Sequence, residues 1–416
     1  MKSYIKTLVT KAKTNSFKLA RLDTAAKNTT LVRMAEYILT EKDYILKENK
    51  KDVTGALKRK LQKSFIDRLT LNEERLDEMA ASLRDIATLP DPVNATIADW
   101  QRPNGLLVKK IRVPIGVVLI IYEARPNVTS DCVGLLFKSS NVGILRGGSD
   151  AIASNTAIAK VLNRAVRASG FDFEPFFVIQ KTSYAVTTGL LKQNEYIDMV
   201  IPRGGEALIR MVVAQSRIPV IKHYKGVCHL FIDADADTAR ALKICVNAKV
   251  QRPGVCNAVE KILVHKDCAA IFLPLLKKEF DAHHVIMRGD DASRKIIKGI
   301  KKATTHDWRA EYLDLIVTIK VVANVSEAIE HINRYGSHHT DSIITNNPAH
   351  EAQFIREVDS ACCFANISTR FSDGHQLGLG AEIGISTDKL HARGPMGLQE
   401  LTTYKWVVTG DGQIRE

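Results

Sequence analysis

The spacing of hydrophobic residues divides the chain into two parts of different character. In residues 1–90, apolar side chains recur every three or four positions, as at Leu31, Met34 and Ile38. This spacing predicts amphipathic helices. The run Leu-Pro-Asp-Pro at residues 89–92 breaks the pattern, because proline cannot continue a helix. We therefore expect a helical N-terminal segment that ends before the prolines.

Residues 100–113 have the pattern of a β-hairpin. Proline, asparagine and glycine at positions 103–105 are turn-forming residues, and they separate two strand-like runs. The second run, residues 106–113, is the predicted return strand.

After residue 115, short β-branched runs alternate with alanine-rich amphipathic segments. This alternation is typical of βαβ units around a mostly parallel sheet, so the sequence predicts an α/β fold. The expected helices include residues 150–169, 269–280 and 325–335. The expected strands are residues 116–122, 142–145, 176–179, 197–201, 219–221, 228–232, 258–264 and 316–322, with a last strand at 404–408.

Composition is that of an ordinary globular protein, with 45% hydrophobic and 25% charged residues. At 416 residues, two or three domains are expected. No apolar run approaches the roughly 20 residues that a membrane helix needs. The lysine-rich N-terminus lacks the apolar core of a secretory signal, so we expect a cytoplasmic protein without membrane association.

Seven cysteines are present, an odd number, and none forms a CxxC pair. This pattern favours neither a disulfide framework nor a zinc site, and it fits a reducing compartment. The histidine pairs 283–284 and 338–339 are adjacent and lack the spacing of metal ligands, so we interpret both as surface pairs and expect no metal.

The net charge is +13, and residues 1–70 hold 17 Lys and Arg against 7 Asp and Glu. We interpret this excess as the solvated face of the N-terminal helices. The alternative is a nucleic-acid-binding surface, which predicts steeply salt-dependent binding. Aromatic residues are not interleaved with the charges as base stacking requires, so we expect no nucleic-acid partner.

The segment QRPGVCNAVEKILVH, residues 251–265, carries the clearest chemical signal. Cys256 ends a Gly-Val run and comes just before an expected strand. A thiol on a tight turn is exposed on one side and surrounded by backbone N–H groups, as a nucleophile that forms an oxyanion needs. The opposite interpretation is a small buried residue, the usual place of a free cysteine.

Two Arg-Gly-Gly turns each follow an expected strand and open a helix. Glycines let a ligand approach the backbone, helix N-termini favour anions, and arginine recognises phosphate. Because the motif occurs twice, it favours a phosphorylated cofactor, although βα turns often need glycine in any case. A 2′-phosphate at the first arginine would select NADPH. The candidate cofactor residues are Arg146, Gly147, Gly148, Arg203, Gly204 and Gly205.

Two further polar segments are candidates. Asn127 follows the strand at 116–122, where its amide could donate to an oxyanion, although it is equally a turn former. Ser368, Thr369 and Arg370 offer closely spaced donors for an amino-acid carboxylate, so they are the candidate substrate residues.

Several long blocks in order along nearly the whole chain resemble the γ-glutamyl phosphate reductase family, also called glutamate-5-semialdehyde dehydrogenase, within the aldehyde dehydrogenase superfamily. They are PIGVVLIIYEARPNVTSD (114–131), ILRGGS (144–149), IPRGGEALI (201–209), HYKGVCHLFID (223–233), VQRPGVCNA (250–258), RFSDGHQLGLGAE (370–382) and STDKLHARGPMGLQELTTYKW (386–406).

The resemblance implies an aldehyde-dehydrogenase-like fold with a Rossmann-like cofactor domain, an α/β catalytic domain and a small β oligomerisation element. Residues 1–223 would bind NADPH, with the hairpin 100–113 contributing to oligomerisation. Residues 224–360 would form the catalytic domain with Cys256. Residues 361–416 would return to the cofactor domain and to the oligomerisation element, in which the last strand joins the hairpin.

The resemblance also implies roles for single residues. Cys256 matches the family nucleophile, and Glu311 resembles the superfamily glutamate that holds a cofactor ribose. Hydrolytic aldehyde dehydrogenases have a glutamate that activates water in the block that corresponds to residues 223–226 here. His-Tyr-Lys-Gly in this chain contains no carboxylate. An acyl-phosphate reductase must exclude water to protect its thioester, so this difference favours reduction.

The expected activity is therefore NADPH-dependent reduction of L-glutamyl 5-phosphate to L-glutamate 5-semialdehyde and phosphate through a thioester, the second step of proline biosynthesis. Lys249 and Arg252 would help to lower the pKa of the thiol. A homo-oligomer is expected, and glutamate 5-kinase is a possible partner. The alternative is another acyl-phosphate reductase or aldehyde dehydrogenase of the same superfamily.

Overall fold

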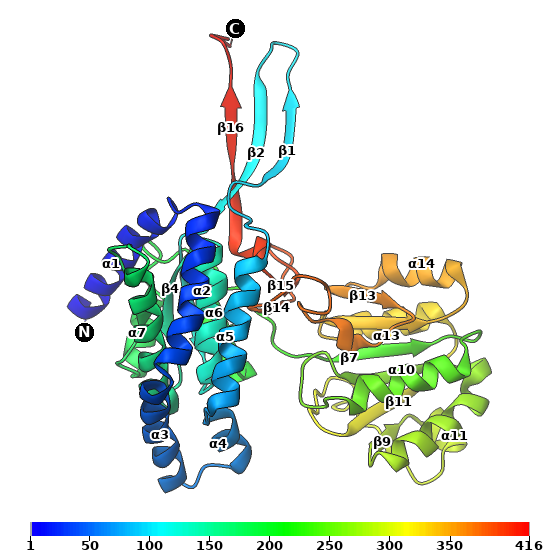
Figure 1. Cartoon of the computed structure of the whole chain (residues 1–416). Coiled ribbons are helices and arrows are strands. Elements are labelled where there is room, and N and C mark those ends of the chain that lie inside the picture. Colours follow the sequence, from blue (N-terminus) through cyan, green and yellow to red (C-terminus); the bar gives the residue numbers. More distant parts are fainter. Residues whose placement is uncertain (1, 416) are drawn as a thin grey trace. The chain divides into compact units, whose positions relative to one another are not determined.

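The computed structural model describes residues 2–415 and separates into two compact units (Figure 1). The first comprises the chain up to Lys222, Leu379–Gly384, and the chain from Met396 onward. The second comprises His223–Gly378 and Ile385–Pro395. The division falls one residue from the boundary expected between the cofactor and catalytic domains. The expected C-terminal segment, 361–416, is shared between the two units.

The N-terminal segment of the first unit is helical, as predicted. Asp23 and Asn72 cap two of its helices by accepting hydrogen bonds from backbone N–H groups three residues ahead. The last of these helices ends at Thr88, before Pro90. The helices are α1 (Lys2–Leu19), α2 (Thr24–Thr40), α3 (Lys42–Lys58), α4 (Lys63–Leu69) and α5 (Glu73–Thr88).

A four-stranded parallel sheet in the order β5-β4-β3-β6 forms the core of this unit. Its strands are β3 (Val117–Tyr122), β4 (Val142–Arg146), β5 (Phe176–Val178) and β6 (Met199–Arg203). Every residue of β3 is buried, which explains its continuous apolar run. The helices between and after these strands are α6 (Pro126–Lys138), η1 (Ser149–Ala151), α7 (Ile152–Ala168), α8 (Tyr184–Leu190) and α9 (Glu206–Gln215).

The strand predicted at residues 219–221 is wrong. These residues make only an isolated bridge, between Val220 and Val200. Pro219 has no N–H to donate, and the pairing consists of one bond to the Pro219 carbonyl and one from Ile221.

The predicted hairpin forms a separate three-stranded antiparallel sheet with the C-terminal strand, in the order β1-β2-β16. In Figure 1 this sheet extends away from the helices of its own unit. Gly105 adopts a positive φ of 88° in the turn, a conformation that favours glycine. The strands are β1 (Thr96–Gln101), β2 (Leu107–Pro114) and β16 (Thr402–Thr409).

The second unit is built on a seven-stranded parallel sheet in the order β10-β9-β11-β8-β7-β12-β13. Its strands are β7 (Cys228–Ile232), β8 (Val259–His265), β9 (Ile286–Gly289), β10 (Lys301–Lys302), β11 (Ile316–Val322), β12 (Thr340–Ile344) and β13 (Cys362–Ala365). The prediction missed β9, β10, β12 and β13.

Helices cover both faces of this sheet (Figure 1). One face packs against α10 and α11 through residues such as Cys245 and Phe272, and the other packs against α13 and α14 through Ile329 and Phe354. These helices and the short ones are α10 (Thr238–Val250), α11 (Lys266–Ala282), α12 (Asp291–Ile296), α13 (Val325–Tyr335), α14 (Pro348–Glu357) and η2 (Thr369–Phe371). Two short strands, β14 (Gly384–Ser386) and β15 (Gly394–Met396), and η3 (Gln399–Leu401) follow.

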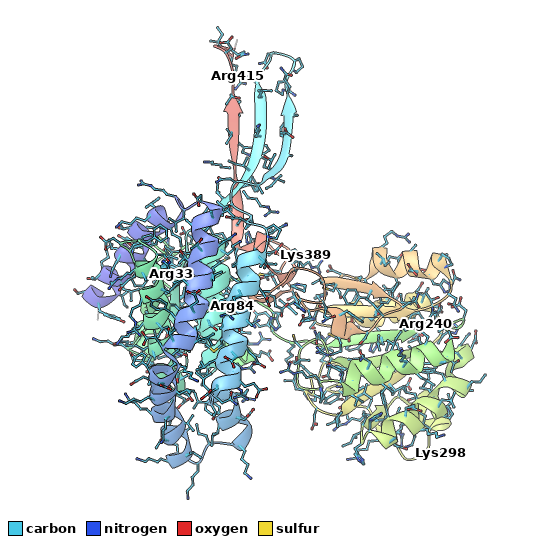
Figure 2. All side chains as sticks on the ribbon, viewed as in Figure 1. Arg33, Arg84, Arg240, Lys298, Lys389 and Arg415 are labelled. Atoms are coloured by element: carbon cyan, nitrogen blue, oxygen red, sulfur yellow. The ribbon has the colours of Figure 1, made fainter. Side chains whose placement is uncertain are left out.

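The basic residues are distributed over many elements, and those labelled in Figure 2 come from α2, α5, α10 and several loops. Several N-terminal lysines and arginines have acidic partners, among them Lys13 with Asp198 at 2.9 Å and Lys27 with Asp91 at 2.5 Å. The Lys13–Asp198 pair is partly exposed, as expected for a solvated helical face, whereas Lys27 is buried and does not belong to such a face. Within residues 2–415, no helix has both the length and the apolar character needed to cross a membrane.

Candidate active site

In the first unit, the predicted cofactor residues gather at the carboxyl edge of the parallel sheet. The two Arg-Gly-Gly turns follow β4 and β6, and the segment with Asn127 follows the neighbouring strand β3. The two glycine turns approach this segment closely. A Cβ on Gly148 would lie 3.1 Å from the Ala124 nitrogen, and the Gly205 N–H donates to the Glu123 carboxylate at 2.9 Å. Asn127 itself is exposed in the first turn of α6.

Carboxylates of the protein occupy the helix N-termini that follow both glycine turns. Asp52 accepts hydrogen bonds from the Ser154 N–H at 2.8 Å and the Ser154 hydroxyl at 2.6 Å, at the start of α7. Burial raises the pKa of Asp52. Glu123 takes the corresponding place before α9. The sequence analysis missed both, because neither carboxylate is near its helix in sequence. In this structure, carboxylates of the protein and not a phosphate receive these N–H groups.

The two arginines have different surroundings. Arg146 donates to the Thr187 hydroxyl at 3.0 Å and to the carbonyls of Thr182 and Gly147 at 2.8 and 3.2 Å. Burial lowers its pKa. Arg203 packs on the backbone of Gly384, where a Cβ would lie 2.4 Å from its guanidinium. Arg146 is therefore anchored mainly by Thr182 and Thr187, which follow β5 in the chain, whereas Arg203 requires glycine at position 384.

A buried polar network lies beneath the first glycine turn. Tyr122 and Thr129 share a hydrogen bond at 2.8 Å, and the Thr129 hydroxyl donates to the Asn155 Oδ1 at 3.0 Å. The Asn155 Nδ2 is buried without a hydrogen-bond partner among the described residues. A Cβ on Gly147 would lie 2.1 Å from this nitrogen. Glycine at this position therefore packs directly on the buried Asn155 amide, where a side chain would not fit.

In the second unit, Cys256 lies in a tight turn before β8, as predicted. The turn is closed by a hydrogen bond from the Ala258 N–H to the Val255 carbonyl at 3.1 Å. Cys256 is half-buried, and its carbonyl accepts from the Cys228 thiol at 3.1 Å. The turn therefore leaves the nucleophile candidate partly exposed, unlike Cys228, which is fully buried.

The segment before β7 packs directly on this turn. A Cβ on Gly226 would lie 1.9 Å from the Cys256 carbonyl oxygen, so only glycine fits there. The Gly226 N–H donates to the Glu311 carboxylate at 2.8 Å, which places Glu311 beside the nucleophile turn. The family resemblance implies a ribose contact for Glu311, and a carboxylate held here has the acceptor atoms for it.

Two histidines complete the site. One ring nitrogen of each of His223 and His339 and the Cys256 Sγ all lie within 4.8 Å of one another. The Nδ1 of His223 donates to the Ile385 carbonyl at 2.9 Å, and the Nδ1 of His339 is 2.8 Å from the Thr340 hydroxyl. Burial, followed by the charge of His223, lowers the pKa of His339 to about 3.

The interpretation of the pair 338–339 as surface residues is wrong for His339, which is completely buried. The cause is the missed strand β12, which begins at Thr340 and places His339 at the amino edge of the sheet. The pair His283 and His284 is exposed, as predicted.

Of the three predicted substrate residues, Arg370 is the one tied to the nucleophile turn. Its guanidinium donates to the Asn257 Oδ1 and, at 2.8 Å, to the Gln251 Oε1. Burial lowers its pKa. Ser368 caps η2, and Thr369 is buried with a hydroxyl that has no hydrogen-bond partner among the described residues.

Buried charges support the loop that carries Glu311. The Lys249 ammonium donates to the Asp314 carbonyl at 3.0 Å, and the Lys261 ammonium donates to the Ala310 carbonyl at 2.7 Å. Glu260 lies 3.4 Å from Lys249. Lys249, expected to act on the Cys256 thiol, is thus engaged by this loop and by Glu260. The sequence gives no signal for this role, because the contacts with the loop join positions 65 and 49 residues apart.

The chain is similar to known proteins over nearly its whole length. Residues 2–296 match the model of the aldehyde dehydrogenase family. The chain is 52% identical over 412 residues to a γ-glutamyl phosphate reductase from Geotalea daltonii, covering 99% of both chains. A γ-glutamyl phosphate reductase from Caldanaerobacter subterraneus is also 52% identical, covering 98% of both chains.

Solved structures agree as well. The crystal structure of γ-glutamyl phosphate reductase from Thermotoga maritima matches with a TM-score of 0.97 and 43% identity, covering 99% of this chain and all of that one. An acetylating aldehyde dehydrogenase from Geobacillus thermoglucosidasius matches with a TM-score of 0.68 at 15% identity over 100% of this chain and 98% of that one, a likeness of fold alone.

Proposed function

Because the chain belongs to the γ-glutamyl phosphate reductases of the aldehyde dehydrogenase family, we propose that it reduces L-glutamyl 5-phosphate to L-glutamate 5-semialdehyde and phosphate, in proline biosynthesis, through a thioester on Cys256. The observation that carries the proposal is the partly exposed Cys256 on a turn that Gly226 and Glu311 enclose. Such a turn exposes the sulfur and leaves backbone N–H groups near it.

In the proposed reaction, the Cys256 thiolate attacks the acyl carbon and forms the C–S bond, while the C–O bond to phosphate breaks. The backbone N–H of Cys256 and the side chain of Asn127 are the proposed donors to the oxyanion. The nicotinamide cofactor of this family supplies the hydride that brings the thioester to the aldehyde level. The C–S bond then breaks, and the thiolate is regenerated for the next cycle.

The cofactor residues proposed for NADPH are those of the carboxyl edge in the first unit, with Glu311 in the second. The position of both glycine turns at the carboxyl edge of a parallel sheet, where α/β folds bind ligands, supports a ligand lying on these turns. A 2′-phosphate at Arg146 would have to replace one of the three acceptors that the guanidinium now has. Preference for NADPH over NADH is part of the proposal.

Substrate recognition is proposed for Ser368, Thr369 and Arg370, with Arg370 as the main contact for the α-carboxylate. Its anchoring to Asn257, next to the nucleophile, supports this assignment. A fixed guanidinium binds a carboxylate with little loss of side-chain freedom. The buried Thr369 hydroxyl would act through the loop and not by direct contact, because its side chain is not accessible.

Assembly and location are also proposals. The β1-β2-β16 sheet exposes Trp100, Tyr404 and Trp406, a group of aromatic side chains typical of interfaces. We therefore propose that this sheet mediates a homo-oligomer. Glutamate 5-kinase is a possible partner, since it would supply a labile acyl phosphate. The described cysteines are all free thiols, which fits the proposed cytoplasmic location.

The decisive experiment runs the reaction in reverse. The purified full-length protein receives L-glutamate 5-semialdehyde and NADP⁺, with and without inorganic phosphate, and NADPH formation is recorded. We expect turnover only with phosphate, because phosphate is the acceptor that releases the acyl group from Cys256. Oxidation at an equal rate without phosphate would instead support the alternative, an aldehyde dehydrogenase that hydrolyses its thioester.

A further inference from the structure

We propose that Cys256, His223 and His339 form a binding site for a thiophilic divalent cation such as Zn²⁺, and that the bound cation reversibly blocks the nucleophile. The donor atoms, one sulfur and two imidazole nitrogens, lie within 4.8 Å of one another. Thiolate and imidazole are the donors that Zn²⁺ prefers. Tetrahedral zinc needs these atoms roughly 3.5 Å apart, so small side-chain rotations suffice.

The two rings are oriented as metal-binding histidines are. In both, Nδ1 is engaged by an oxygen: the Ile385 carbonyl for His223 and the Thr340 hydroxyl for His339. Such bonds hold the ring and leave Nε2 for a metal. The Nε2 of His339 is buried and has no hydrogen-bond partner among the described residues. An unsatisfied donor or acceptor at this depth is rare, and a metal ion would satisfy it.

The local field also suits a cation. α10 ends at Val250, six residues before Cys256, and α13 ends at Tyr335, four residues before His339. Since both helices run back from the carboxyl edge, their C-termini and partial negative charges lie at the amino edge. The positive charge of Arg370, which is anchored next to Cys256, acts against this attraction for a cation. A cation must therefore form a strong bond to sulfur, which selects Zn²⁺ or Cd²⁺ over Mg²⁺ or Ca²⁺.

Three protein ligands leave a fourth position of the metal open, as in exchangeable zinc sites. Binding would replace the proton of the Cys256 thiol: the S–H bond breaks, a sulfur–metal bond forms, and the proton goes to solvent. A sulfur bound to the metal cannot attack an acyl carbon. Inhibition by the bound cation depends on the proposed role of Cys256 in the reaction. Binding of the cation does not depend on that role.

The test uses the full-length protein, freed of metal with EDTA and then dialysed. Titration with Cd²⁺ is followed by the ultraviolet absorption of the thiolate–cadmium bond, and titration with Zn²⁺ by calorimetry. We expect one equivalent to bind, the absorption to be lost in Cys256→Ser, and Zn²⁺ affinity to fall roughly tenfold or more in His223→Asn and His339→Asn. Cys268→Ser and His283→Asn, which alter a partly exposed cysteine and an exposed histidine, serve as controls.

His339 is buried, so the thermal unfolding of its variant is measured first, and the partly exposed His223 provides the independent test. The site is disproved if Cys256→Ser keeps the absorption or if both histidine variants bind Zn²⁺ as tightly as the parent. Zn²⁺ should also stop turnover, and EDTA should restore it. If Zn²⁺ binds and turnover continues, the proposed inhibition is disproved, but the binding site is not. Full activity of Cys256→Ser would disprove the proposed reaction and leave the binding result standing.

Discussion

The two units use opposite edges of their parallel sheets. In the first, the candidate cofactor residues follow the strands, at the carboxyl edge, where α/β sheets usually bind ligands. In the second, His223, Cys256, Glu311 and His339 all precede their strands, at the amino edge. The helix ends at the two edges therefore differ. Helix N-termini lie at the carboxyl edge used in the first unit, and helix C-termini lie at the amino edge used in the second. Helix N-termini favour anions, and the carboxylates of Asp52 and Glu123 take this place in the first unit, whereas the proposed thiolate at the amino edge depends on local contacts.

The central strands of the two sheets also differ. β3 of the first unit is wholly buried and carries no charged residue. β8 of the second unit buries Glu260 and Lys261 near its start, with both side chains directed to the loop of Glu311. Buried charges are costly in stability. The first unit also buries charged side chains, Lys27, Lys138 and Asp52, but these lie on its helices and not on its central strand.

The strongest test of the amino edge is replacement of Cys256, the proposed nucleophile. Cys256→Ser should lower the rate of the phosphate-dependent reaction at least about a thousandfold, because an alcohol is a poor substitute for a thiolate. NADPH binding, followed by fluorescence titration, should stay unchanged. Cys268→Ser in the same unit should be fully active. A Cys256→Ser protein with near-parental rates would show that the amino edge is not the reaction site.

The second test concerns the close packing behind the nucleophile. Gly226→Ala should displace the Cys256 turn, since the added Cβ would lie 1.9 Å from the Cys256 carbonyl oxygen. We expect a loss of stability of about 1–3 kcal/mol and a fall in kcat of roughly a hundredfold. Urea denaturation and steady-state kinetics measure the two effects.

Gly254→Ala is the matched control for this change. It lies two residues before Cys256, and its Cβ would meet only the Leu313 oxygen at 3.8 Å, an ordinary contact. Equal losses of stability and kcat in the two variants would mean that any added side chain in the region disturbs the site. The specific requirement for glycine at position 226 would then be disproved.

The third test probes the buried polar interior of the second unit. Burial, followed by the charge of His229, lowers the pKa of His331 from 6.5 to about 2. The unfolded chain therefore binds a proton below pH 6.5 that the folded protein does not. Above pH 6.5, His331 therefore leaves the free energy of unfolding unchanged. As the pH falls below this value, protonation of the unfolded chain lowers the free energy of unfolding, by about 2 kcal/mol at pH 5.

Urea denaturation at pH 7.5 and 5 measures this loss. His331→Gln should reduce the difference in unfolding free energy between the two pH values, whatever its effect at pH 7.5. His283→Gln, which changes an exposed histidine, should leave the difference as in the parent. An unchanged difference in His331→Gln would mean that this histidine is protonated in the folded protein.

The smallest expected effect tests the carboxyl edge. Arg146→Leu should raise KM for NADPH about tenfold relative to KM for NADH, because one charged contact to the 2′-phosphate is lost. The ratio of the two constants separates this contact from the loss of the bonds to Thr182 and Thr187. Arg210→Leu, which alters an arginine of α9, should leave the ratio unchanged. A constant ratio in Arg146→Leu would assign the 2′-phosphate to another residue.

The sequence predicts much of this fold because apolar runs and turn residues act locally. The strand that became β3, the hairpin and the Cys256 turn were all predictable from their own residues. β12 was not, since Thr340, Asp341 and Ser342 give its first half a polar pattern, although all three are buried. Their burial depends on partners such as His229, more than 100 residues away, which bonds Asp341 at 2.8 Å. His339 was misinterpreted for the same reason.

The candidate site shows the same division. Both glycine turns, Cys256 and Arg370 can be found from residue type and spacing. Asp52 and Glu123 at the helix N-termini cannot, because each carboxylate acts on a helix distant in the sequence. The need for glycine at position 226 is equally invisible, since its neighbour is the backbone of Cys256, 30 positions later.

The pairing of β16 with β2 has a consequence for synthesis. The register joins Thr402 to Pro114, so the middle strand waits for a partner made roughly 290 residues later. At about 5–20 residues per second, a ribosome needs roughly 15–60 seconds to supply it. During that interval β2 has one open edge, and a strand edge without its neighbour readily pairs with another chain. Neighbouring nascent chains on one messenger are therefore the first candidates to occupy it.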